Sequence, residues 1–180
     1  MRVAIVKASE QHQFSNVRSL RDLKQFAAGQ GKTWTDTFIL ESNGLTVEKT
    51  LKYDNLFPML EGDRFDYFPR GIHEPWREIV RFKDLNLTVD PHIIIRYVAP
   101  LYFFIRKDNH QLKQTLDEQF EALIEDGTFA QLFFSDSDVR NALSRANTKQ
   151  RIIIDLDNPL LTPETPIHRK ELWFDPLSGS

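Results

Sequence analysis

The 180-residue sequence contains no cysteine, which excludes disulfide bonds, thiolate zinc sites, iron–sulfur clusters and cysteine nucleophiles. It also lacks an excess of basic residues, since 23 Lys and Arg stand against 26 Asp and Glu. Nucleic-acid-binding domains depend on a strongly basic surface, so we predict no nucleic-acid partner. Long apolar runs are missing as well, and those at 93–95 and 102–105 are far too short to cross a bilayer.

The N-terminal stretch, MRVAIVKASEQ, has only four apolar residues between Arg2 and Lys7, too few for the core of a signal peptide. We therefore expect no export signal in this sequence. Aromatic residues are plentiful, with 14 Phe, 4 Tyr and 3 Trp. Burying one Phe contributes about 1.5–3 kcal/mol, so the composition predicts a packed core and not a disordered chain.

The hydrophobic pattern predicts strands and helices that alternate with short connections. Strands are expected at 2–7, 26–29, 46–50 and 65–68, and helices after Ser19, Thr35 and Asp54 and over 73–82. This order is typical of parallel βαβ units and predicts an α/β fold. Later elements are extended runs at 87–89, 93–98 and 101–105, helices after Asn109 and over 129–134 and 139–146, and a strand at 152–155.

Familiar catalytic and metal-binding motifs do not fit the sequence. Gly31, Lys32 and Thr33 match the end of a phosphate-binding loop, but Phe26 stands where that motif needs its first glycine. The five histidines are scattered and show no ligand spacing, so neither a metal nor a cofactor is expected. A nucleophile-elbow motif, G-x-S-x-G, is also missing.

The stretch GQGKTWTDTF lies between a predicted strand and the start of a predicted helix. Free main-chain N–H groups and the positive end of the helix dipole meet at such a place and favour an anion. The hydroxyls of Thr33 and Thr35 would add hydrogen bonds, and Trp34 would cover an apolar part of a ligand. The alternative is that Thr35 only caps the helix while Trp34 packs inward.

A second candidate group is FDYFPRG, a predicted strand that runs into a turn. The carboxyl ends of parallel strands face the ligand crevice in open α/β sheets, so Arg70 would project there. Its guanidinium can bind a carboxylate through two hydrogen bonds, with Tyr67 and Gly71 lining the site. The alternative is an Arg70 that pairs with Glu74 or Asp66.

Three stretches together resemble the bacterial extracellular solute-binding protein family 3, the type II periplasmic binding proteins of amino-acid uptake. The stretches are SLRDLKQFAAGQGKTWTDTFILESNGL, YDNLFPMLEGDRFDYFPRG and LYFFIRKDNHQLKQTLDEQFEALIEDGTFAQLF. The resemblance implies two α/β lobes that close on a small solute without catalysis. It also implies a membrane ABC transporter as partner and a periplasmic location.

Mapped onto this sequence, the resemblance divides the chain. Residues 19–98 would form a complete lobe two, and 1–18 a partial lobe-one strand with the crossover. Residues 99–155 would be the returning lobe-one strand and helices, and 156–180 an irregular tail that Trp173 and Phe174 fix to the body. Most of lobe one has no counterpart, so we expect a truncated member that binds solutes only weakly. Unpaired strands at 2–7 and 93–105 would favour a homodimer or a domain swap.

The family pattern bears on the ligand as well. Its acidic residue for an α-amino group falls at Arg70, which predicts an anionic or zwitterionic solute. The family's Gly-Thr-Thr stretch corresponds to residues 32–35 and supports a role for Thr33 and Thr35. Two alternatives stay open. One is a sensor or interaction fragment without a ligand, and the other is an enzyme that reuses the fold as transglycosylases do, with Glu74 as the nearest carboxylate.

Overall fold

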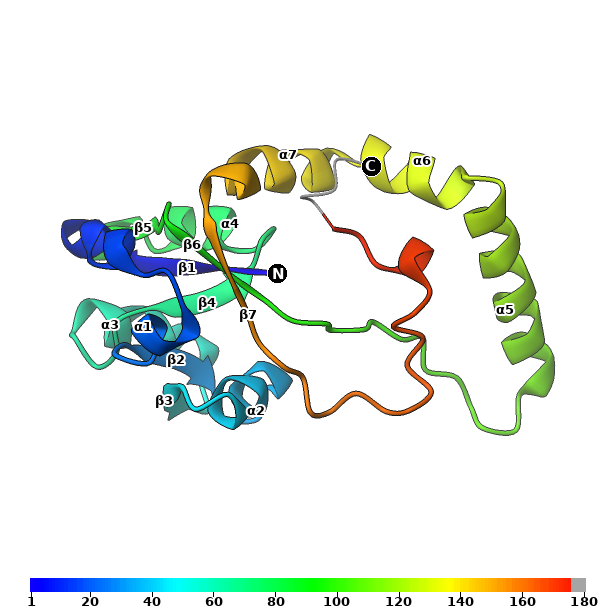
Figure 1. Cartoon of the computed structure of the whole chain (residues 1–180), viewed down its shortest axis with the longest axis horizontal. Coiled ribbons are helices and arrows are strands. Elements are labelled where there is room, and N and C mark those ends of the chain that lie inside the picture. The colour runs from blue at the N-terminus through cyan, green and yellow to red at the C-terminus, as the bar shows by residue number, and fades with distance from the viewer. Residues whose placement is uncertain (176–180) are drawn as a thin grey trace.

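The computed structural model describes residues 1–175 as a mixed α/β protein in which a compact body continues into a helical arm (Figure 1). The main sheet has the strand order β4, β1, β6, β7. These strands are β4 (Phe68–Gly71), β1 (Arg2–Lys7), β6 (Ile93–Arg96) and β7 (Ile152–Asp155), and β5 (Leu87–Val89) also pairs with β1. A second, parallel pair joins β2 (Ala27–Gly31) to β3 (Thr46–Thr50). The predicted α/β class is confirmed.

The strand directions bring most strand ends to one side. Strand β1 is antiparallel to β4, β5 and β6, while β6 and β7 are parallel. A parallel bridge between Ala28 and Tyr67 links β2 to the chain entering β4. Strands β2, β3, β4, β6 and β7 therefore end along one side, which we call the carboxyl edge. The predicted parallel pairing holds for β2–β3 and β6–β7, whereas β1 runs against its neighbours.

Local sequence explains where the body helices begin and end. They are α1 (Leu20–Leu23), α2 (Thr35–Ser42), α3 (Leu56–Glu61) and α4 (Pro75–Arg81). Helix α1 begins as predicted, because the Ser19 hydroxyl accepts a hydrogen bond from the Asp22 N–H. Helix α4 has Pro75 in its first turn, where a missing N–H costs nothing. Past the end of α2, Gly44 has a φ of 78°, which glycine adopts without strain.

The core covers both faces of the main sheet. The four central residues of β1 are all buried and point alternately to opposite faces, a pattern typical of a strand packed on both sides. Ala4 and Val6 belong to one apolar cluster with Phe14 and Tyr67, whereas Ile5 belongs to a second one with Phe57 and Phe68. Short 3-10 segments connect these layers at Ala8–Asn16, Tyr53–Asn55, Lys83–Leu85 and Thr148–Gln150.

The arm contains α5 (His110–Glu125), α6 (Thr128–Ser135) and α7 (Ser137–Ala146). Its helices agree with the predicted ones, and Asn109 caps α5 as expected, with its side chain accepting from the Leu112 N–H. Helix α7 touches the body, because Asp138 pairs with Arg77 of α4 and Ala142 and Ala146 are buried. By contrast, α5 and α6 bury no residue.

Two predicted strands differ from the structure. The strand expected at 65–68 begins only at Phe68, because 65–67 are held by β2 through main-chain bonds such as Gly29 N–H to Tyr67 O at 2.8 Å. The run at 101–105 forms no strand, since no other strand lies beside it within residues 1–175.

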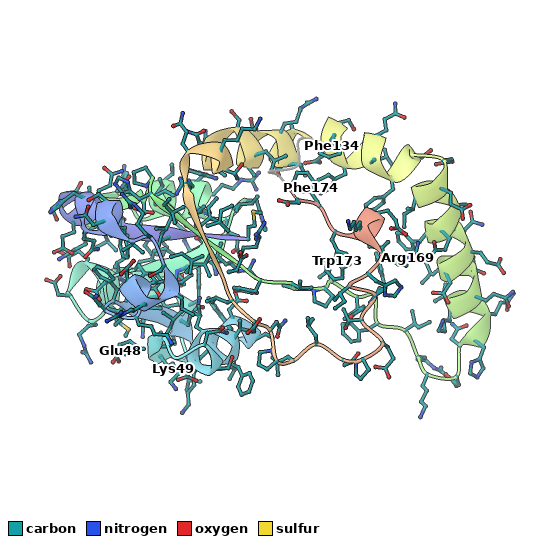
Figure 2. The ribbon with its side chains drawn as sticks, viewed as in Figure 1. Glu48, Lys49, Phe134, Arg169, Trp173 and Phe174 are labelled. Carbon is teal, nitrogen blue, oxygen red and sulfur yellow. The ribbon has the colours of Figure 1, made fainter. Side chains whose placement is uncertain are left out.

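The part of the tail that the structure describes is irregular except for a 3-10 turn at Lys170–Leu172. Phe174 contacts the rings of Phe133 and Phe134 in α6 (Figure 2), so it fixes the tail to the arm. Trp173 donates to Pro166 O within the tail itself. Residues 176–180 of the predicted tail lie outside the described residues.

The strands assigned to different lobes share one sheet. Strand β1 lies between β4 and β6, and β7 lies beside β6. The prediction that 2–7 and 93–98 lack neighbours is therefore wrong, because both pair on two sides. The division into lobes stays a prediction for the arm, in which α5 and α6 lie apart from the sheet (Figure 1).

Candidate functional site

Polar side chains from five elements, or from residues directly next to them, lie at the carboxyl edge. Arg2 starts β1, Asp36 lies in the first turn of α2, Arg70 is in β4, Glu74 precedes α4, and Tyr97 follows β6. We call these five residues the edge cluster. Ligands of open α/β sheets bind beyond the carboxyl ends of parallel strands, so this edge is where a solute site is expected.

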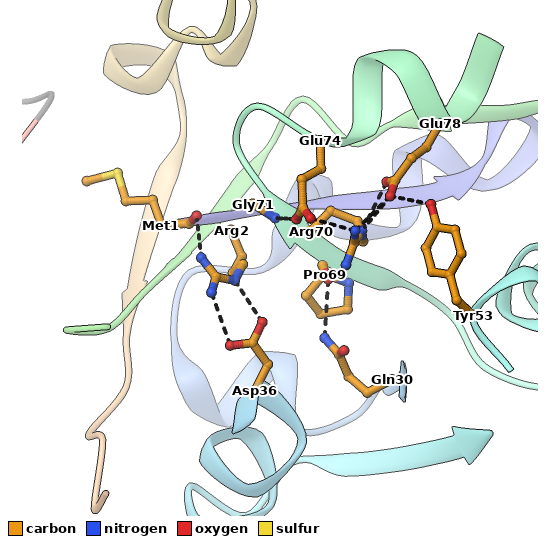
Figure 3. A network of polar contacts seen from close by, with 10 residues as sticks. All are labelled: Met1, Arg2, Gln30, Asp36, Tyr53, Pro69, Arg70, Gly71, Glu74 and Glu78. Carbon is orange, nitrogen blue, oxygen red and sulfur yellow. Dashed lines mark hydrogen bonds and ion pairs between the residues drawn. The ribbon is translucent and has the colours of Figure 1, made fainter. Parts of the chain in front are cut away.

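Arg2 and Asp36 form the first half of the cluster. The Arg2 Nε donates to Asp36 Oδ2 at 2.9 Å and its Nη2 donates to Oδ1 at 3.1 Å (Figure 3). Both side chains keep 20% of their surface exposed, so solvent reaches the pair. The guanidinium lies over the Tyr97 ring, 5.1 Å from its centre. The Tyr97 hydroxyl is buried and makes no hydrogen bond of normal geometry within residues 1–175.

Opposing effects act on the Asp36 carboxyl. Burial raises its pKa, but the hydrogen bonds and charge of Arg2 outweigh burial and hold the pKa below its usual value. Burial likewise raises the pKa of the Tyr97 hydroxyl, which therefore stays protonated at neutral pH. The cluster thus presents an ionised pair beside a protonated hydroxyl.

Arg70 forms the second half of the cluster and is already paired. Its Nε donates to both carboxylate oxygens of Glu78 at 3.0 Å, and its Nη2 donates to Glu78 Oε1 and Glu74 Oε1 at 2.7 Å (Figure 3). The Tyr53 hydroxyl also donates to Glu78, at 2.5 Å. Only 11% of the Arg70 side chain is exposed. The sequence left open that Arg70 pairs with Glu74, and the structure shows this pair together with a second one to Glu78.

Trp34 packs inward. Its indole stacks on Phe68 with ring centres 6.2 Å apart and lies 5.2 Å from the Arg70 guanidinium. A Cβ atom on Gly31 would come within 2.4 Å of this indole, so glycine is required there. Thr35 does not cap α2, because Trp34 occupies the N-cap position and no side chain caps it. Instead the Thr37 hydroxyl donates to Gly31 O at 2.7 Å.

Thr33 and Thr35 line a hollow beside the edge cluster with a volume of about 360 Å³. Its other lining residues are Lys32, Trp34, Thr37, Phe38, Glu41 and Lys49. The Lys49 ammonium pairs with Glu41 at 2.6 Å, whereas Lys32 is exposed and forms no ion pair within residues 1–175. The structure therefore brings Thr33, Trp34 and Thr35 together.

Tyr67 and Gly71 do not line an open site. Tyr67 is fully buried in the core between β2 and β4, and burial raises the pKa of its hydroxyl. Gly71 is also buried, and its N–H donates to Glu74 Oε2 at 2.6 Å. Both residues are buried and neither lines the hollow, so their lining role stays a prediction.

Sequence reasoning missed Arg2, Asp36, Glu78 and Tyr97. Arg2 and Asp36 are separated by 34 residues, and no spacing rule links a strand start to a helix start. Glu78 was detectable in part, since it lies one helical turn after Glu74 on the same face of α4.

Comparisons with known proteins give likeness in structure only. Comparison with protein families gives no match, and comparison with curated sequences gives none either. The YckB protein of Bacillus subtilis is similar at 20% identity and a TM-score of 0.49, over 87% of this chain and 62% of that one. The amino-acid ABC transporter substrate-binding protein AbpA of Streptococcus pneumoniae, bound to L-arginine, is similar at 19% identity and a TM-score of 0.45. The match covers 81% of this chain and 59% of that one.

A third similar structure is the ancestral amino-acid-binding protein AncCDT-1, a precursor of cyclohexadienyl dehydratase. It matches at 15% identity and a TM-score of 0.48, over 75% of this chain and 56% of that one. This chain thus spans less than two thirds of each of the three chains. Among residues 1–175, no helix is long and apolar enough to cross a membrane.

Proposed function

We propose that this chain binds a small zwitterionic solute, such as an amino acid, at its carboxyl edge and does not catalyse a reaction. The observation that carries the proposal is the edge cluster itself. There the partly exposed Arg2–Asp36 pair lies beside the buried Tyr97 hydroxyl, beyond the ends of β2, β4 and β6.

The charges of the site favour a solute that carries an ammonium group. Arg70 alone would repel an ammonium, but Glu74 and Glu78 both pair with it. Together with the Arg2–Asp36 pair, two guanidinium groups face three carboxylates, which leaves a net negative charge. The solute's ammonium would contact Asp36 or Glu74, and its carboxylate would contact Arg2 or the Thr33–Thr35 hollow. A dicarboxylate without an ammonium would bind less well.

The geometry supports binding more than it supports an enzyme. Both oxygens of Glu74 accept charge-assisted or main-chain hydrogen bonds, from Arg70 and from the Gly71 N–H. A transglycosylase-like general acid must instead hold a proton for its substrate. The two contacts suit an ionised, fixed carboxylate, so Glu74 is a ligand-positioning group in this proposal.

The wider role follows from the family resemblance of the sequence. We propose delivery of the solute to a membrane ABC transporter from a periplasmic location. The edge cluster belongs to one side of a two-lobed site, so binding by this chain alone should be weak. A dissociation constant of 1 mM corresponds to about 4 kcal/mol, which a few charged hydrogen bonds can supply.

The test is a two-dimensional amide NMR titration of the isotope-labelled chain. The probes are L-arginine, L-glutamine, L-glutamate and succinate, the last without an ammonium group. We expect at least one amino acid to shift the amide signals of Thr35, Asp36, Gly71 and Tyr97, with succinate weaker. Spectra that ignore every amino acid, or that respond to succinate most strongly, would contradict the proposal.

Two variants distinguish the loss of a charge in the edge cluster from the loss of a charge elsewhere on the surface. Asp36→Asn removes a carboxylate of the edge cluster and should weaken amino-acid binding at least about tenfold, because a charged hydrogen bond contributes about 1.5–3 kcal/mol. Glu48→Gln removes the same charge from the exposed face of β3 (Figure 2) and should leave binding unchanged. Equal loss in both variants would place the effect outside the edge cluster.

A further inference from the structure

The chain exposes more surface than a compact protein of its mass. Its accessible surface is 11466 Å² at 21.1 kDa. Folded monomers of this mass expose about 9,000 Å², so the excess is about 2,400 Å². Obligate dimers bury about 1,000–2,500 Å² on each subunit, which is the size of this excess. The excess accessible surface of the chain is therefore as large as the area that each subunit of a stable dimer buries.

Much of the exposed apolar surface lies on the arm and the segment that leads to it. Leu101 is 97% exposed, Phe104 93% and Phe103 73%. Further exposed apolar side chains of the arm are Leu112, Phe129, Leu132 and Phe134. Extensive exposed apolar surface is typical of a site that contacts a partner. Helix α7 contacts the body through α4, whereas α5 and α6 bury no residue.

The main chain of residues 101–105 is also unpaired. The segment LYFFI is rich in residues that favour strands. Yet its N–H and C=O groups make no main-chain hydrogen bond among residues 1–175. Side-chain contacts hold it on both sides. The hydroxyls of Tyr102 and Thr165 form a hydrogen bond of 3.2 Å, and the rings of Phe103 and Phe120 pack with their centres 5.2 Å apart. An extended, unpaired and apolar segment is a template for strand pairing.

We propose that residues 101–105 pair antiparallel with the same residues of a second copy of this chain, so that the two arms cover each other. A twofold axis at Phe103 would place Leu101 opposite Ile105 and Tyr102 opposite Phe104. In this register Arg106 faces Pro100 and Lys107 faces Ala99, so no like charges oppose each other. Pro100 has no N–H and ends the pairing. Such a self-complementary contact closes as a symmetric dimer.

The absence of cysteine makes the register directly testable. Phe103→Cys puts one thiol on the twofold axis, where the opposed Cα atoms of an antiparallel pair lie about 4.5–5.5 Å apart, within disulfide range. Mild oxidation should link most of the protein into a covalent dimer. Leu51→Cys, at a site that is 77% exposed on the body, is the matched control and should stay unlinked. Equal linking of both variants, or of neither, would overturn the proposed register.

Light scattering after size exclusion tests the dimer itself, with the full 180-residue chain. The expected mass is twice 21.1 kDa. Phe103→Asp places two carboxylates face to face and should halve the mass, whereas Phe38→Asp, at an exposed site on α2, should not. Circular dichroism checks that both variants remain folded. A monomeric unsubstituted chain, or one that is monomeric and binds lipid vesicles through this segment, would overturn the proposal.

Discussion

Asp36 holds the Arg2 guanidinium through two hydrogen bonds, of 2.9 Å and 3.1 Å, and thereby joins the first turn of α2 to the start of β1. The pair connects the two sheets of the body at the carboxyl edge, since α2 follows β2 and β1 is central in the main sheet. The same contact that we assign to solute binding therefore also contributes to the fold.

Arg2→Ala should lower the free energy of unfolding by about 1.5–3 kcal/mol, because it leaves the partly buried Asp36 carboxylate without its charged donor. Chemical denaturation measures the effect. The matched control is Arg77→Ala, which breaks a pair with Asp138 whose side chains are 81% and 65% exposed. Exposed ion pairs contribute at most about 1 kcal/mol. A larger loss of stability for Arg77→Ala than for Arg2→Ala would contradict the prediction.

The Asp36 pair should make stability depend on pH in acid. The folded pKa of Asp36 lies below its unfolded value, because Arg2 outweighs the effect of burial. The pair therefore stabilises the protein above the unfolded pKa of about 4, and this contribution is lost as the pH falls through the folded pKa. The stability difference between the unsubstituted chain and Asp36→Asn should shrink below pH 4. A difference that stays constant with pH would argue against the ionised pair.

Arg70→Met should destabilise the fold by about 3–5 kcal/mol, since it leaves Glu78, 10% exposed, as a buried carboxylate without a cation. Denaturation by urea measures the loss, and replacing both residues by apolar ones should recover part of it. Arg81→Met is the control, because its pair with Asp54 is more than half exposed on both sides. Equal losses at Arg70 and Arg81 would show that Arg70 is not a buried structural cation.

Gly31→Ala should cost about 1–3 kcal/mol through overpacking, because its Cβ would lie 2.4 Å from the Trp34 indole. The displaced indole should also change the tryptophan fluorescence. A double-mutant cycle identifies the cause: in a Trp34→Leu background, the same glycine substitution should cost clearly less. An unchanged cost in that background would mean that Gly31 is needed for a reason other than its contact with Trp34.

Local signals sufficed for most elements. The expected strands at 46–50, 87–89 and 152–155 coincide with β3, β5 and β7, and Ser19 caps its helix as predicted. These features depend on side-chain periodicity and on hydrogen bonds between residues three or four apart. The run at 101–105 carries the same local signal but remains without a partner, because a strand needs a neighbour that the local sequence does not supply.

The residues of the candidate site also differ in how far the local sequence predicts their surroundings. Thr33, Trp34 and Thr35 are adjacent in sequence, so the strand-to-helix connection brings them to one hollow, which α2 and β3 complete. For Arg70 the sequence predicts either a cation that binds an anionic group or a pair with Glu74 or Asp66. Its two carboxylate partners, Glu74 directly before α4 and Glu78 within it, change the local charge from positive to negative, and that outcome depends on how α4 packs against β4.

The sequence by itself determined the α/β class, the positions of most strands and helices, and a polar strand-to-helix turn at residues 31–36, because these depend on short-range propensity and burial pattern. Only the tertiary structure decided which charges meet. The antiparallel placement of β1 brings Arg2 to the carboxyl edge beside Asp36, and the helix after β4 neutralises Arg70. Charge pairs form over a few ångströms in space, and separation along the chain says nothing about that distance.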